Sequence, residues 1–419
     1  MTMPLMKPRK KNLVLRTRQM NLPPWARGRT ALGMTAAAAE GRFELQVCQR
    51  CQAVQYPPRD ACHRCLSSQL RWTAQSGAGE LLSETVLHHS NDPFYRERLP
   101  WRLGLIRLDV GPTVIAHLHG DVASPSTSTV RVHVGARLDR AGAAVLIGFP
   151  PEETEHMADD TMLREMTSDP KFRKILVTDG KTEVGQALVK ALVKAGAEIV
   201  WVGHAEPWKK LPGLDDIAAL TQVTLVPLDL TDGRSVSELA GEIGGKVDIV
   251  VNNAEVHRAF GIASRRGTDA AKAEMDINYF GLLRLAQELG PALKARSADG
   301  TTHAAAWVNV LSVYALSNYP PHGTFSASKA AAYSLAQCLR AEMRPSGIRV
   351  VNVFPGPIDD EWNQNLPPPK VAPAALASAI VKALKDGIED VYPGDVAQEW
   401  VERWRENPKV LERELAGGG

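Results

Sequence analysis

Cysteine is scarce in this chain of 419 residues, and four of its five cysteines lie in one short stretch, residues 48–65. The sequence therefore has no chain-wide pattern of paired cysteines like those that stabilise small exported domains. Long apolar segments are absent too: no run of about 18 uncharged apolar residues occurs, so we expect no transmembrane helix. The first residues also lack the pattern of a secretory signal peptide. These absences predict a protein of the cytoplasm.

An excess of charge of either sign is also missing. Lysine and arginine number 49 and aspartate and glutamate 47, so the net charge of +2 gives no general reason to expect nucleic-acid or membrane partners. The start of the chain is the exception, because residues 1–39 contain eight basic and no acidic residues. We interpret residues 1–40 as a basic N-terminal arm. It is either a solvated extension or a segment that docks on an acidic partner or a phosphate-bearing ligand.

The cysteine-rich stretch predicts a metal site. Two Cys-x-x-Cys pairs, Cys48/Cys51 and Cys62/Cys65, are separated by ten residues, the spacing of a four-thiolate zinc ribbon. The alternatives are two disulfides or four unrelated thiols, but the spacing and the absence of export signals favour zinc. Four protein ligands leave no position for water, so the zinc is expected to be structural. The fifth cysteine, Cys338, lies in an apolar helical pattern and is predicted to pack in a core.

The region after the cysteines predicts a small β-barrel. Residues 41–75 form the expected ribbon, and residues 76–150 contain five short strand patterns separated by turn signals. Five such strands after a zinc ribbon fit a barrel of the OB type. Such barrels also bind single-stranded nucleic acid, but sparse aromatic residues and a modest charge argue against a nucleic-acid partner here. The strand patterns cover 79–87, 101–108, 113–118, 130–134 and 144–149.

Specific runs in this half carry a resemblance to a known family. They are Gly41 to Cys48, Tyr56-Pro57-Pro58-Arg59 and Cys65-Leu66-Ser67. With the barrel that follows, residues 20–150 resemble the acyl-CoA-associated zinc-ribbon/OB-fold family. The resemblance implies a partner subunit of a thiolase-like enzyme, which helps to hold acyl-CoA and supplies no catalytic residue of its own.

The second half predicts a different fold. Residues 151–173 are interpreted as a linker, and residues 174–395 alternate short apolar strands with helical patterns. That alternation predicts a doubly wound parallel sheet of the Rossmann type. Residues 396–419 are expected to form an amphipathic C-terminal helix and tail, with Pro408 breaking or kinking the helix. The fold class is therefore multidomain: a zinc ribbon and OB-fold barrel fused to an α/β Rossmann-like domain.

Residues 174–395 resemble the short-chain dehydrogenase/reductase family along their whole length. The residues that match its catalytic and cofactor-binding pattern are Thr178, Gly180, Gly185, Asp229, Asn252, Asn278, Ser312 and Lys329. In that family a tyrosine four residues before the lysine transfers a proton to or from the substrate oxygen. Here that position is Phe325, which has no proton to transfer. A displaced donor is conceivable, because Tyr314 and Tyr319 are close in sequence, but neither keeps the spacing to the lysine.

The cofactor pattern is altered as well. A pyrophosphate needs small residues so that backbone N–H groups at a helix N-terminus can approach it. Two of three glycines in the family's loop are Asp179 and Glu183, the Asn-Asn-Ala-Gly turn ends in Glu255, and a cofactor-holding threonine is Asp360. Like charges about 4 Å apart repel by roughly 4 kcal/mol at an effective dielectric constant near 20. Lys181 is the expected counter-charge, and NAD(P) binding is predicted to be lost.

These patterns predict an accessory acyl-CoA-binding or scaffold subunit of a thiolase or retro-aldolase complex. The dehydrogenase-like domain is expected to be inactive, with no catalytic residue in use. The resemblance implies a homodimer formed through helices around Asn278–Glu288 and Phe325–Met343, where Ala330, Ala331, Ala332 and Ala336 permit close packing. The alternative is an active NAD(P)-dependent reductase of a ketoacyl-CoA or related carbonyl compound, fed by the fused barrel.

Overall fold

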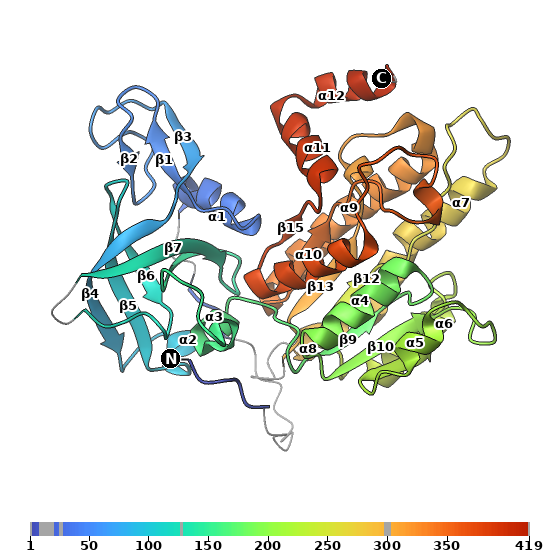
Figure 1. Cartoon of the computed structure of the whole chain (residues 1–419), viewed down its shortest axis with the longest axis horizontal. Coiled ribbons are helices and arrows are strands. Elements are labelled where there is room, and N and C mark those ends of the chain that lie inside the picture. The colour runs from blue at the N-terminus through green and yellow to red at the C-terminus, as the bar shows by residue number, and fades with distance from the viewer. Residues whose placement is uncertain (1, 8–20, 25–27, 126–128, 297–302, 418–419) are drawn as a thin grey trace. The chain divides into compact units, whose positions relative to one another are not determined.

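The computed structural model describes residues 2–7, 21–24, 28–125, 129–296 and 303–417 (Figure 1). Of these, residues 2–7, 21–24, 28–125, 129–169 and 385–388 form one compact unit, and the remainder form a second. Most basic residues of the predicted arm lie outside the described residues: Arg9, Lys10, Lys11, Arg16, Arg18 and Arg27. No helix of the described ranges is long and apolar enough to cross a membrane.

The first unit begins with a three-stranded antiparallel sheet in the order β2-β1-β3. Its strands are β1 (Glu44–Cys48), β2 (Val54–Gln55) and β3 (Leu70–Ala74). The register pairs Glu44 with Ala74 at one end and Cys48 with Leu70 at the other. Phe43 and Leu45 pack into the hydrophobic core of the barrel that follows, so the cysteine end of the sheet points away from that core.

Five further strands of this unit close into a barrel in the order β4-β5-β6-β8-β7. They are β4 (Ala78–Leu87), β5 (Trp101–Leu108), β6 (Thr113–Leu118), β7 (Val130–Leu138) and β8 (Ala144–Phe149). Burial alternates along β6, as expected for a strand with one face inside a barrel. The predicted OB-type barrel is confirmed. Helix α1 (Leu32–Ala39) packs Met34 and Ala38 against its core, so the end of the arm is structured. Short helices α2 (Pro93–Arg96) and α3 (Thr161–Arg164) complete the unit.

The second unit is built on a parallel sheet of seven strands in the order β11-β10-β9-β12-β13-β14-β15. The chain runs outward from β9 to one edge and then returns to place β12 beside β9, which creates a switch point between them. The strands are β9 (Lys174–Val177), β10 (Ile199–His204), β11 (Val223–Pro227), β12 (Ile249–Asn252), β13 (Ala306–Val310), β14 (Arg349–Val353) and β15 (Asp390–Val391). The predicted doubly wound sheet is confirmed, with the short β15 as an addition.

Helices pack against this sheet in two groups. Helix α4 (Glu183–Lys194) contacts α5 (Leu214–Ala218), whereas α8 (Leu282–Arg296) contacts both α6 (Gly233–Ile243) and α9 (Gly323–Met343). A π-helical segment, Asp276–Gly281, joins α7 (Asp269–Met275) to α8. The remaining helices are α10 (Pro373–Asp386), α11 (Asp395–Glu406) and α12 (Pro408–Ala416).

Two sequence predictions about these helices have clear outcomes. Pro408 does break the C-terminal helix: α11 ends at Glu406, and Asn407 caps α12, which begins at the proline. Cys338 was predicted to pack in a core, and this is wrong, because it is exposed on α9. Small residues lie on both the inner and the outer face of α9, so the apolar pattern of its sequence does not mark the buried face. Ala332 and Ala336 are buried, whereas Ala330 and Ala331 are half-buried.

Candidate functional site

The four clustered cysteines form a site that fits zinc. All four Sγ atoms lie within 4.8 Å of one another. The Sγ atoms of Cys48 and Cys65 are 3.6 Å apart, as are those of Cys51 and Cys62. A tetrahedral zinc ion with Zn–S bonds of about 2.3 Å holds its sulfur atoms about 3.8 Å apart, so this cluster has the right size for zinc. Backbone N–H groups, first that of Cys51, lower the pKa of the Cys48 thiol to about 6, which favours the thiolate that zinc requires.

In the second unit, the loop from β9 to α4 contains residues that the sequence assigned to a cofactor. The Thr178 hydroxyl donates to Asn252 Oδ1 at 3.2 Å and accepts the N–H groups of Asn253 and Ala254. The Asn253 side chain bonds both the N–H and the C=O of Asp179. Thr182 caps α4 by accepting the N–H of Gly185. The loop is therefore held by the protein's own hydrogen bonds.

Three glycines that remain in this region are required by packing. An added Cβ at Gly185 would lie 2.0 Å from the carbonyl oxygen of Asp179, and one at Gly203 would lie 2.2 Å from that of Thr178. A Cβ at Gly180 would lie 2.3 Å from the Val202 side chain. Contacts this short force the backbone or a neighbouring side chain to move. These positions therefore remain glycine whether or not a cofactor binds.

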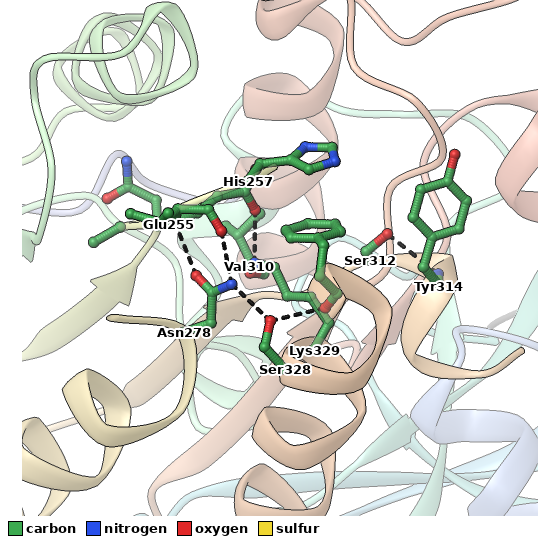
Figure 2. A network of polar contacts seen from close by, with 12 residues as sticks. Glu255, His257, Asn278, Val310, Ser312, Tyr314, Ser328 and Lys329 are labelled. Atoms are coloured by element: carbon green, nitrogen blue, oxygen red, sulfur yellow. Dashed lines mark hydrogen bonds and ion pairs between the residues drawn. The ribbon is translucent and has the colours of Figure 1, made fainter. Parts of the chain in front are cut away.

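A buried ion pair joins Lys329 to Glu255 at the centre of the site (Figure 2). The Lys329 Nζ lies 2.6 Å from Glu255 Oε2 and donates to the carbonyl oxygen of Val310 at 3.0 Å. The lysine side chain is 2% exposed and the glutamate side chain 18% exposed. A pair this close, largely removed from water, fixes the position of both side chains. The lysine is therefore occupied by a residue of its own chain.

The ring of Phe325 fills the space beside this ion pair. It is buried, stacks on His257 with ring centroids 3.7 Å apart, and lies 5.5 Å from Lys329 Nζ. His257 shares a hydrogen bond of 2.8 Å with His322. Burial lowers the pKa of His257 to about 4, so both the stack and the histidine pair are uncharged at neutral pH. An apolar and neutral cluster thus occupies the position at which the sequence pattern expects a phenol.

The other predicted catalytic residues are committed to local hydrogen bonds. The Ser312 hydroxyl accepts the N–H of Tyr314. Asn278, in the π-helical segment, accepts the N–H of Val256 and donates to its carbonyl oxygen and to Ser328. Figure 2 shows the Tyr314 ring beyond Ser312, with its hydroxyl directed away from Lys329. Tyr314 stacks on Tyr319, and burial raises its pKa, so this phenol is a poor proton donor to the site.

Three of the four predicted carboxylates influence one another. Burial raises the pKa of Asp179, and Glu255 raises it further. Burial and Glu255 likewise raise the pKa of Asp360 to about 6. Lys181 opposes part of this effect at Asp179 through its backbone N–H and its charge. The fourth carboxylate, Glu183, is exposed at the start of α4. Asp229, another residue of the cofactor-binding pattern, accepts the N–H and the hydroxyl of Thr231.

Sequence reasoning missed two features of this site. It identified Glu255 as an added charge but did not pair it with Lys329, because 74 residues separate them and nothing local links them. It also missed His257 and His322. In the sequence, a histidine three residues after an Asn-Asn-Ala turn does not indicate a functional site. Its contact with the second histidine arises only in the folded chain.

The first unit contains a cavity of about 240 Å³ beside the barrel. Its walls include the apolar side chains of Trp101, Leu118 and Met162 and the guanidinium groups of Arg98 and Arg102. Arg98 pairs with Glu165, and Arg102 pairs with Glu84 and donates to backbone carbonyl oxygens. The carboxylates Asp160 and Glu165 also line the cavity, which therefore combines an apolar surface with paired charges of both signs.

Comparisons with known families match three segments of the chain. Residues 35–71 match the model described as "ChsH2, rubredoxin-like zinc ribbon domain", and residues 72–142 match "ChsH2, C-terminal OB-fold domain". Residues 173–370 match the model of the short chain dehydrogenases. The zinc ribbon and OB-fold matches agree with the fold of the first unit, and the dehydrogenase match agrees with the fold of the second.

Individual relatives resemble the second unit. A short-chain dehydrogenase from Burkholderia cenocepacia, solved in complex with NADP, is 33% identical, with a TM-score of 0.53 over 59% of this chain and 98% of its own. An uncharacterized oxidoreductase of Mycobacterium tuberculosis is 29% identical over 49% of this chain, which spans 60% of that relative's length. One from Staphylococcus aureus is 27% identical over 50% of this chain and 89% of its own.

Removing the lysine of the ion pair should destabilise the second unit. We expect Lys329→Met to lower the free energy of unfolding by about 1–3 kcal/mol, because Glu255 is then left partly buried without its cation. The double variant Lys329→Met/Glu255→Gln should recover most of this loss. Urea unfolding followed by tryptophan fluorescence measures both, with Lys190→Met on α4 as the exposed-lysine control. If the single and double variants are equally stable, the pair does not hold the site.

Asp360 should make stability depend on pH. Its folded pKa of about 6 lies above the unfolded value, so between about pH 4 and pH 6 the folded state holds a proton that the unfolded state has lost. Stability therefore falls as pH rises through this window. Asp360→Asn keeps the cap of Trp362 and should stabilise the protein by about 1–3 kcal/mol at pH 7 and by almost nothing at pH 4. The control is Asp359→Asn, a change at the exposed neighbouring residue. If Asp360→Asn stabilises the protein equally at both pH values, the raised pKa of Asp360 is not the cause.

Proposed function

Because this chain joins a ChsH2-type zinc ribbon and OB-fold domain to a member of the short-chain dehydrogenase family, we propose that it is an accessory subunit of a thiolase-superfamily enzyme. In this proposal the first unit docks the enzyme and helps to hold its acyl-CoA substrate. The second unit serves as a scaffold that performs no redox chemistry. The protein acts in the cytoplasm, where thiols stay reduced and available to zinc.

The observation that carries the loss of redox chemistry is the ion pair between Lys329 and Glu255 beside Phe325. A reductase of this family needs a lysine that is free to act on the cofactor and on a tyrosine. In this chain the lysine is paired with Glu255, and Phe325 stands at the position of the tyrosine. Asp179 and Asp360 place further carboxylates near Glu255, where a cofactor would bring phosphate charge. Like charges repel, so these residues oppose binding of a dinucleotide.

The acyl-CoA part of the proposal rests on the first unit. The cavity of about 240 Å³ has apolar walls of the kind that an acyl or pantetheine chain prefers, and its arginines, Arg98 and Arg102, are paired with glutamates. The structural zinc would hold the ribbon and has no role in the chemistry, since protein thiolates fill its coordination shell.

A scaffold role is supported by a face of the second unit centred on Phe280, which is 44% exposed. A hollow of about 510 Å³ lies on this face and is lined by Met275 and Phe280 among others. Lys272 and Asp276 precede Phe280 by eight and four residues, and Arg284 and Glu288 follow it by four and eight. Arg284 pairs with Asp276 of its own chain at 2.8 Å, and in an antiparallel pair of such helices Lys272 faces Glu288 of the other copy. We therefore propose a homodimer through this face.

An active NAD(P)-dependent reductase of a ketoacyl-CoA or related carbonyl is the second candidate. The Burkholderia relative was solved in complex with NADP, and this chain keeps Asn278, Ser312 and Lys329. Each of the three has a structural contact that explains why it is kept: Asn278 bonds Val256, Ser312 caps a 3-10 turn, and Lys329 pairs with Glu255. Binding of NADPH distinguishes the two candidates.

We expect the full chain to bind NADPH with a Kd above about 1 mM by calorimetric titration. The variant Asp179→Gly/Glu183→Gly/Glu255→Gly should bind at least about 100-fold more tightly, because repulsion worth a few kcal/mol is removed. Hydride transfer to acetoacetyl-CoA should then require the further change Phe325→Tyr. Glu238→Gln/Glu242→Gln/Glu402→Gln controls for net charge. Micromolar binding and turnover by the unaltered chain would establish the reductase instead.

The accessory role predicts an effect on a partner's activity. A thiolase-superfamily enzyme that co-elutes with the full chain should turn over acyl-CoA at least about 10-fold faster with the chain than without it, because the chain completes substrate binding. The Phe325→Tyr variant should activate equally well, since the second unit supplies no chemistry. Chelating the zinc should abolish activation by unfolding the ribbon. Equal turnover with and without the chain would refute the accessory role.

A further inference from the structure

The second zinc knuckle presents an unusual leucine. Leu66 follows Cys65, is 81% exposed, and has φ = +60°. The left-handed region costs a residue with a Cβ roughly 1–2 kcal/mol relative to glycine. A lone exposed leucine needs no explanation, since soluble proteins carry many. An exposed leucine in a conformation that glycine would adopt without strain carries two costs, one for the exposed apolar surface and one for the backbone conformation.

The knuckle turn explains the backbone conformation but not the leucine. The N–H of Leu66 donates to the carbonyl oxygen of Cys62, which closes the turn around the second cysteine pair. The first knuckle has the same turn: Gln52 has φ = +58°, and its N–H donates to the carbonyl oxygen of Cys48. Glutamine is polar and also exposed there. The two knuckles therefore share one backbone geometry, and only the second turns a large apolar side chain to solvent.

Buried hydrogen bonds hold the second knuckle in place. The side chain of Gln55, which is 3% exposed, accepts the N–H of His63 at 3.0 Å and donates to Gln46 Oε1 at 2.9 Å. The same oxygen of Gln46 accepts the N–H of Arg59 at 2.9 Å. The loop that carries Leu66 is thus braced on both sides by the sheet. A backbone held this way loses little further freedom when the knuckle binds a partner, which favours affinity.

The surroundings of Leu66 are positively charged. Residues 49–79 contain four arginines and a single acidic residue, Asp60. Arg50, Arg59 and Arg64 are exposed, and the ion pairs of this ribbon within the described residues involve Arg42 instead. A single-stranded nucleic acid would prefer aromatic platforms, whereas an aliphatic side chain suits an apolar pocket in a protein. Positive charges around it suit a pocket rimmed by carboxylates.

We propose that Leu66, on a ribbon that also exposes Arg50, Arg59 and Arg64, is the anchor by which the zinc ribbon docks on its protein partner. The partner surface is an apolar pocket bordered by acidic side chains. This inference rests on the proposed function, since the partner it names is the thiolase-superfamily enzyme. It deepens that function by assigning the contact to one knuckle of the ribbon and not to the barrel.

The test compares Leu66→Gly with Gln52→Gly in the full chain, using the co-eluting thiolase-superfamily enzyme as the probe. Both changes suit a left-handed φ, so zinc content should stay the same and thermal stability should not fall. Burying one leucine is worth about 1.5–3 kcal/mol, so Leu66→Gly should raise the Kd roughly 10- to 100-fold, and Gln52→Gly should leave it within about 2-fold. Arg64→Ala should weaken binding at low salt and flatten its salt dependence.

Each other outcome is decisive. If the enzyme binds both glycine variants as tightly as it binds the unaltered chain, the docking anchor is wrong while the accessory role stands. If the enzyme binds the unaltered chain not at all, both proposals fail together. If a single-stranded oligonucleotide of 20 nucleotides binds more tightly than the enzyme and Arg64→Ala abolishes this binding, the ribbon recognises nucleic acid and the protein-docking anchor is overturned.

Discussion

The buried ion pair between Lys329 and Glu255 is the interaction on which the chemistry of the second unit depends. A lysine that is 2% exposed must be paired, because an isolated buried charge is very costly. Glu255 supplies the pair from the loop after β12, and the Val310 carbonyl supplies a further acceptor. These bonds use two of the three N–H donors of the lysine, and Phe325 beside it can offer no proton.

The glycines of this unit show which positions of its sequence are constrained by packing. Gly180, Gly185 and Gly203 remain, and at each of them a Cβ would meet the protein's own backbone or a packed side chain. Glycine is missing at Asp179, Glu183 and Glu255, the positions where the family pattern needs room for a cofactor. Packing of the sheet and helices therefore accounts for the glycines that remain. The acidic residues at the other three positions are the basis of the proposal that this domain is a scaffold.

Much of the fold was predictable because its signals are local. Cys-x-x-Cys spacing, alternating strands and the β–α alternation each act over a few residues, and the barrel and the parallel sheet followed from them. The content of the site was partly predictable: Phe325 and the added carboxylates are visible in the sequence. The pairing of Lys329 with Glu255, the stack of His257 on Phe325 and the exposure of Cys338 depend on contacts between distant segments, which no local pattern encodes.

A crystal structure of the full chain grown with millimolar NADPH tests the central claim most directly. The account predicts Lys329 Nζ within ion-pair distance of Glu255, the Phe325 ring stacked on His257, and no nucleotide density against Gly185. Ordered dinucleotide in that position, with Lys329 turned away from Glu255 toward the cofactor, would contradict it.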